Sequence, residues 1–194
     1  AMKSEGSSNE MSRGDWAEEK GGCERENDLP QICARCEEYA SEGARYLLSG
    51  NAEITMEVNP ATVDYDSLVR YRRAGINRLS IGVQSFQDEE LKAIKRRPRQ
   101  NTIYQALDDI RQMDFPYFNI DLIYGIKGQT VESFLYSLEE ALRFQPNELF
   151  IYPLYVRQGT GITEREPDDV CFRMYRAACK LLQAKGFLQT SMRR

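Results

Sequence analysis

Three polar residues, Glu57, Gln84 and Asp121, stand in successive short apolar runs that have the pattern of β-strands. In each run apolar and polar residues alternate, so that the polar side chains share one face of the strand. Two carboxylates and an amide at neighbouring strand ends can bind polar groups of a ligand. Each residue alone is explained as well by a solvated strand, loop or turn position, but three in register favour a binding site.

The composition excludes several kinds of chemistry. The 194 residues include no histidine, which removes His-dependent nucleophile systems, His-ligated zinc and non-haem iron sites with a His–carboxylate triad. The 26 basic and 30 acidic side chains give a net charge of −4, which argues against a nucleic-acid partner. No apolar run is long enough for a membrane span. Five irregularly spaced cysteines predict a reducing compartment, and we expect a cytoplasmic protein.

Alternating strand and helix patterns begin near residue 53. The predicted strands are Glu53–Asn59, Asn77–Gln84, Phe118–Tyr124 and Glu148–Pro153. The predicted helices are Asp64–Ala74, Asp88–Arg97, Thr102–Met113, Val131–Phe144 and Asp168–Lys185, with N-caps at Asp64, Asp88 and Thr130 and C-terminal glycines at Gly75 and Gly186. This order predicts an α/β protein in which parallel βα units form an open partial TIM-type barrel.

Side-chain direction along the strands indicates where a ligand would bind. The apolar face carries Ile54, Met56, Val58, Leu79, Ile81, Val83, Phe118, Ile120 and Leu122, and we expect it to pack under the helices. An antiparallel sheet with one wet face would alternate in the same way. The intervening helices favour parallel pairing, and a polar inner face then marks a ligand site at the carboxyl ends of the strands.

The chain divides into two parts by composition. Residues 1–52 are polar, contain Cys23, Cys33 and Cys36, and are predicted to be partly disordered. Residues 53–194 form the predicted barrel, in which Cys171 and Cys179 lie on an apolar helix stripe typical of buried core thiols. The C-terminal GFLQTSMRR is typical of the start of a further strand, so we expect a fragment of a longer protein or a shortened homologue.

Three motifs together resemble a known family. These are E-x-N-P from Glu57, RLSIGVQSF from Arg78 and IDLIYGIKGQT from Ile120. Their combination is similar to the radical S-adenosylmethionine family of oxygen-independent coproporphyrinogen III dehydrogenases and their heme-chaperone relatives. The resemblance runs from about Glu53 to Thr160 and more weakly to Arg194.

The resemblance implies that S-adenosylmethionine lies across the strand ends. Glu57 would bind its amino group, Gln84 and Asp121 would hold ribose hydroxyls or nearby polar groups, and Arg96, or its neighbour Arg97, would pair with a carboxylate. It also implies a 4Fe-4S cluster, a 5′-deoxyadenosyl radical, a small, tetrapyrrole-like substrate, and an electron donor such as flavodoxin or ferredoxin. The cluster ligands would be Cys23, Cys33 and Cys36.

The chain departs from the family pattern at several points. Cys33 and Cys36 form C-A-R-C, but Cys23 lies ten residues before Cys33, and a C-x-x-C pair alone is equally compatible with a zinc site or surface thiols. Pro98 stands where the family usually has histidine, and Arg157 where an acid is typical. The alternative function is a non-catalytic heme or tetrapyrrole-binding protein, with Cys or Tyr as iron ligand; Tyr152 and Tyr155 are candidates.

Overall fold

Four adjacent parallel strands form one side of a single six-stranded sheet in the computed structural model, which describes residues 2–4, 50–96 and 100–191. The sheet order is β2-β3-β4-β5-β1-β6. The parallel strands are β2 (Thr55–Val58), β3 (Arg78–Gln84), β4 (Tyr117–Tyr124) and β5 (Glu148–Pro153). The four predicted strands and their parallel pairing are therefore confirmed, as is the open barrel-like architecture.

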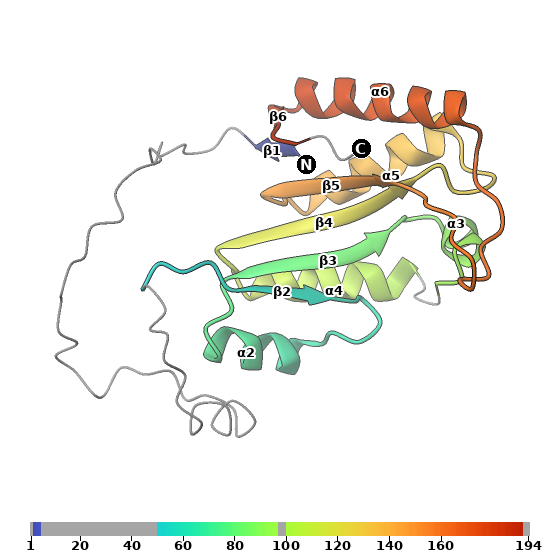
Figure 1. The fold of residues 1–194 in the computed structure, drawn as a ribbon. Helices are drawn as coiled ribbons and strands as arrows, with labels where there is room; N and C mark the ends of the chain where they lie inside the picture. The colour runs from blue at the N-terminus through green and yellow to red at the C-terminus, as the bar shows by residue number, and fades with distance from the viewer. Residues whose placement is uncertain (1, 5–49, 97–99, 192–194) are drawn as a thin grey trace, which may run out of the picture.

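Helices follow each parallel strand, and most of them cover one face of the sheet (Figure 1). The helices are α2 (Tyr65–Arg73), α3 (Asp88–Ala93), α4 (Gln100–Gln112), α5 (Val131–Arg143) and α6 (Asp168–Ala184). The short helix α3 lies instead beyond the end towards which β2 and β3 point, at the right of Figure 1. We call the opposite face of the sheet, which carries Glu57 and Asp121, the inner face. Among the described residues, no helix has the length and apolar character required to cross a membrane.

The first residues of the helices show which local capping signals were sufficient to predict where a helix begins. Asp64 accepts a hydrogen bond from the Ser67 amide at 2.8 Å, and Thr130 forms a reciprocal capping box with Ser133. The prediction for Asp88 was wrong, because it is the first residue of α3 and its carboxylate accepts instead from the Gln100 amide at the start of α4. The long-range partner of this carboxylate was not visible in its local sequence.

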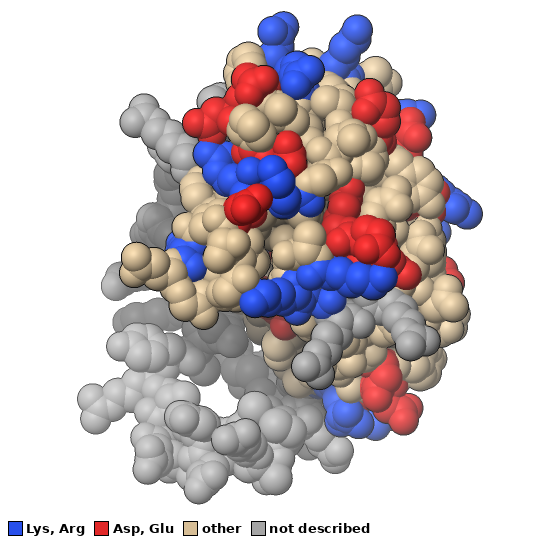
Figure 2. Space-filling model, turned by 90° about the vertical axis from the view of Figure 1, so that its right-hand side faces the viewer, with Lys and Arg blue, Asp and Glu red and all other residues tan. Residues whose placement is uncertain are grey.

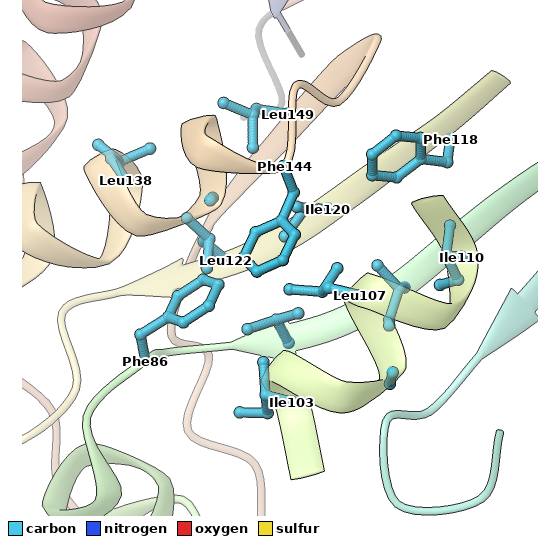
Figure 3. Packing of buried hydrophobic residues seen from close by; sticks show 14 of the residues in the cluster. Phe86, Ile103, Leu107, Ile110, Phe118, Ile120, Leu122, Leu138, Phe144 and Leu149 are labelled. Carbon is cyan, nitrogen blue, oxygen red and sulfur yellow. The ribbon is translucent and has the colours of Figure 1, made fainter. Parts of the chain in front are cut away.

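The core lies between the outer face of the sheet and the helices (Figure 3). Leu107 and Ile110 of α4 face Ile120 and Leu122 of β4, and Phe86 closes the cluster beyond the end of β3. The predicted apolar strand positions belong to this cluster, either fully buried or packed against it: Ile54, Met56, Val58, Leu79, Ile81, Val83, Phe118, Ile120 and Leu122. The polar set therefore occupies the inner face, as predicted.

Two short strands extend the sheet beyond β5. Strand β6 (Phe187–Gln189) confirms the strand predicted after Gly186. Strand β1 (Met2–Ser4) was not predicted, and it pairs antiparallel with both β5 and β6. On α6, Cys171 is buried and Cys179 is half-buried, and both thiols are free, in agreement with the predicted core stripe.

Candidate ligand site on the inner face

Asp121 is the centre of a polar network on the inner face. Its Oδ1 accepts from the Asn119 amide nitrogen at 2.8 Å, and its Oδ2 accepts from the Ser80 hydroxyl at 3.3 Å. The Asn119 amide nitrogen also donates to the Ser80 oxygen at 3.0 Å. Glu57 lies opposite Ser80 in the sheet, and Asp121 lies opposite Gly82, so the three parallel strands bring these groups to neighbouring positions.

The environment of Asp121 raises its pKa to about 6. Burial of the carboxylate is the main cause, and the nearby negative charge of Glu57 acts in the same direction. The hydrogen bonds from Ser80 and Asn119 and the charge of Arg78 oppose the shift. A half-buried carboxyl group that titrates this close to neutral pH is typical of functional sites.

Gln84 ends β3 in a strained conformation. Its φ is +72°, and the Ser85 amide donates to the Val83 carbonyl at 3.0 Å, which makes Gln84 the centre of a γ-turn of the rare positive-φ form. Its side-chain nitrogen lies 2.7 Å from the point where a Cβ at Gly82 would stand. Because Gly82 is the β3 neighbour of Asp121, a glycine there allows the Gln84 amide to lie over the strand beside Asp121.

The predicted cation is not brought into this group. Arg96 follows α3 and is exposed, and among the described residues its guanidinium makes no hydrogen bond or ion pair with Glu57, Gln84 or Asp121. Arg97 lies outside the described residues. The structure thus brings together Glu57, Gln84 and Asp121 of the four predicted ligand-binding residues.

The predicted cluster ligands, Cys23, Cys33 and Cys36, also lie outside the described residues. Within the part of the chain that the structure describes, no three His, Cys, Asp or Glu side chains are grouped so that they could hold a metal ion. The cluster prediction therefore stays a prediction.

Sequence reasoning missed the partners of Asp121. Ser80 and Asn119 were not named as candidate site residues, although the alternation in their strands places both on the polar face. The Oδ1 of Asn119 is buried and has no hydrogen-bond partner among the described residues. A buried oxygen without a partner costs free energy, and an apolar residue at position 119 would avoid this cost. The asparagine is therefore better explained by the network that it forms with Asp121. The alternation of polar residues in β4 was the signal that pointed to this side chain.

The side of the molecule towards which β2 and β3 point carries both signs of charge (Figure 2). Basic side chains form a band across the middle of this side, with acidic groups next to it. Ion pairs among the described residues include those of Lys127 with Glu164 and of Arg165 with Asp168.

A separate cavity of about 470 Å³ lies between the loop after β5 and the start of α6. Its lining includes Tyr155 and Phe172, whose exposed fractions are 55% and 60%. The Cys171 thiol also lines it, and burial raises the pKa of this thiol, although Arg165 at 3.4 Å acts against the shift. Tyr152 lies on β5, stacked against Phe150 with ring centroids 6.0 Å apart. The two tyrosines named as possible iron ligands are therefore in different surroundings.

Comparisons with known proteins identify the family. The sequence profile of the radical SAM superfamily matches residues 25–141, a stretch that includes Cys33 and Cys36 but not Cys23. The heme chaperone HemW of Escherichia coli is 38% identical over 150 residues, which are 75% of this chain and 40% of the relative. The oxygen-independent coproporphyrinogen III oxidase of Thermostichus vulcanus is 37% identical over 107 residues, which are 55% of this chain and 33% of the relative.

A solved structure supports the same relationship. Coproporphyrinogen III oxidase (HemN) from Escherichia coli, described as a radical SAM enzyme, superposes with a TM-score of 0.70 and 26% sequence identity. The match covers 81% of this chain and 38% of that protein. The chain thus spans about two fifths or less of the length of these relatives, and the resemblance seen in its strand motifs is confirmed. The chain belongs to the radical SAM superfamily, and among its members it is similar to HemN and HemW.

Proposed function

We propose that this chain forms the S-adenosylmethionine-binding part of a radical enzyme that acts on a tetrapyrrole-like substrate. The observation that carries the proposal is the position of Glu57, Gln84 and Asp121 at adjacent points of the inner face, with Asp121 in a network that favours an acceptor role. Relatives whose names contain coproporphyrinogen oxidase support the assignment to an enzyme group.

The residues fit the chemistry of S-adenosylmethionine. This ligand offers an ammonium group and two ribose hydroxyls as donors, and Glu57 and Asp121 are carboxylates that can accept from them. Gln84 adds an amide that can both donate and accept. Since Asn119 and Ser80 hold both oxygens of Asp121, its carboxyl plane is oriented before the ligand arrives, which reduces the entropy lost on binding.

The remaining parts of the proposal concern groups outside the described residues. Cys23, Cys33 and Cys36 would hold a 4Fe-4S cluster, which supplies the electron that cleaves S-adenosylmethionine to a 5′-deoxyadenosyl radical. The residues of the inner face would orient the ligand and limit the access of water. A flavodoxin or ferredoxin would supply electrons, and we place the protein in the cytoplasm because free thiols and such a cluster need a reducing compartment.

Calorimetric titration with S-adenosylmethionine tests the proposal. Asp121→Ala should weaken binding by roughly tenfold or more, because it removes a pre-oriented charged acceptor. Asp108→Ala is the matched control, since Asp108 is an exposed carboxylate of α4, whose buried side chains pack against the outer face of the sheet. Equal affinities of the Asp121→Ala variant and the unaltered chain would contradict the proposed site.

A second candidate function is heme or tetrapyrrole binding without catalysis. It is favoured by the similarity to proteins named heme chaperone and by the aromatic cavity beside α6, which Tyr155, Phe172 and Cys171 line. A heme titration followed by absorbance tests it, with Tyr155→Phe and Cys171→Ala as variants. A Soret shift at stoichiometric heme that one of these variants abolishes would support this function. No shift at stoichiometric heme would exclude it for this chain.

A further inference from the structure

A buried carboxylate outside the inner face connects the strand ends that carry Gln84 and Asp121. This carboxylate belongs to Glu90 of α3, which is among the few charged residues of the described chain that are buried. We propose that Glu90 is a positioning residue: it keeps Gln84 in its strained turn and holds the ends of β3 and β4 in register for ligand binding. This inference rests on the function proposed above.

Three neutral donors converge on the Glu90 carboxylate. Its Oε2 accepts from the Ser85 hydroxyl at 2.6 Å and from the Gln129 side-chain nitrogen at 2.8 Å. Its Oε1 accepts from the Ser133 hydroxyl at 2.6 Å. These donors come from the end of β3, from the turn after β4 and from the first turn of α5. A single side chain therefore ties three separate segments to α3.

The first connection fixes the turn at Gln84. Ser85 follows Gln84 directly, and its amide closes the γ-turn by donating to Val83. The Ser85 side chain is fully buried; its hydroxyl donates to Glu90 and accepts from the Gln87 amide at 2.9 Å. A strained backbone persists only where its surroundings hold it, and the bonds of Ser85 are the nearest ones able to hold this turn.

The second connection reaches the strand of Asp121. The side-chain oxygen of Gln129 accepts from the Gly125 amide at 2.8 Å and from the Ile126 amide at 3.3 Å. Gly125 is the first residue after β4, four positions beyond Asp121. Because Gln129 donates to Glu90 at the same time, the exits of β3 and β4 are linked through one carboxylate.

A carboxylate suits this place for two reasons. It is a pure acceptor with room for several hydrogen bonds, whereas an apolar side chain would leave Ser85 and Gln129 only their longer contacts with Ser137 at 3.4 Å and with the Ile123 carbonyl at 3.3 Å. In addition, Ser133 lies in the first turn of the 13-residue helix α5, where the helix dipole favours negative charge.

Two substitutions at Glu90 separate its hydrogen bonds from its charge. Glu90→Leu removes all three acceptor contacts. Glu90→Gln keeps an oxygen for Ser85 and Gln129 and turns its amide towards Ser133, whose hydroxyl can then donate to the Thr130 carbonyl at 3.2 Å. Ser85→Ala is a milder variant that removes only the contact next to Gln84, and it serves if Glu90→Leu does not fold.

Two control variants separate positioning from general effects. Glu89→Gln alters an exposed carboxylate of the same helix, which pairs with Lys92. Leu107→Ala, in the core, lowers the free energy of unfolding without touching the strand ends. Neither control should change the affinity for S-adenosylmethionine more than twofold.

The readouts are S-adenosylmethionine affinity and amide hydrogen exchange of residues 85–87, 125 and 126. We expect Glu90→Leu to lose at least tenfold in affinity, Ser85→Ala at least threefold and Glu90→Gln less than threefold. The named amides should exchange at least tenfold faster in Glu90→Leu than in the unaltered chain, while amides of α4 should change less.

Either of two results would overturn the inference: unchanged exchange at these amides in Glu90→Leu, or an affinity loss in Leu107→Ala equal to that in Glu90→Leu. If the unaltered chain does not bind S-adenosylmethionine, the proposed function fails, and the exchange data still decide whether Glu90 holds the strand ends.

Discussion

Asp121→Asn should stabilise the fold at neutral pH while it weakens ligand binding. In the native state burial and the charge of Glu57 raise the pKa of Asp121 to about 6, well above the 3.8 of an unperturbed aspartate. Between these two values the folded protein binds more protons than the unfolded chain, so stability falls as pH rises through this window and is constant above it. The ionised carboxylate thus costs on the order of 2–3 kcal/mol of stability at neutral pH.

Asparagine removes this cost and keeps the local hydrogen bonds. The Oδ1 of the new asparagine can accept from the side-chain nitrogen of Asn119. Its side-chain nitrogen can donate to the Ser80 oxygen, which in the unaltered chain already accepts from Asn119. We therefore expect Asp121→Asn to exceed the unaltered chain in free energy of unfolding by about 2 kcal/mol at pH 7.5. At pH 5, which lies between the two pKa values, the difference should fall to roughly half, and it should nearly vanish only below the unfolded value of 3.8, where Asp121 is protonated in both states.

Urea denaturation at both pH values measures this difference. Glu57→Gln gives an internal check, because loss of its negative charge should lower the pKa of Asp121 and move the pH-dependent region to lower pH. The same gap between Asp121→Asn and the unaltered chain at pH 5 and pH 7.5 would refute the reasoning, since it would mean that Asp121 does not titrate in this window.

Four further substitutions test the packing that supports the site. Gly125→Ala should lower the free energy of unfolding by at least about 2 kcal/mol, because the φ of Gly125 is +82° and the added Cβ would stand 2.6 Å from the Cys171 sulfur. Gly128→Ala should lower it by only about 1 kcal/mol, because φ is +84° there but the added Cβ would meet open space. Equal losses for the two variants in thermal unfolding would contradict the clash at Gly125. Thr130→Ala should lose about 1 kcal/mol in urea denaturation through its capping box, and no loss would mean that α5 does not depend on this cap. Leu107→Ala should lose about 3 kcal/mol in the same assay, and a loss below 1 kcal/mol would show a core that collapses around the cavity.

Local patterns in the sequence determined most of the architecture. The two-residue alternation in Glu53–Asn59 and Phe118–Tyr124 depends only on strand geometry, and it assigned Glu57 and Asp121 to the inner face correctly. The helical segments between strands were sufficient for parallel pairing, and the caps at Asp64 and Thr130 depend on contacts within one turn.

Only the tertiary structure decided which side chains form hydrogen bonds with Asp121 and Glu90. Ser80 reaches Asp121 from 41 residues away, and Gln129 reaches Glu90 from 39 residues away. No local period encodes such distances, because they depend on which strands lie side by side and on how far each turn extends. The sequence by itself therefore determined which face of the sheet would be polar. The fold decided that Asp121 is held by Asn119 and Ser80 and that a buried carboxylate of α3 links the ends of β3 and β4, while among the described residues Arg96 makes no hydrogen bond or ion pair with the other three predicted residues.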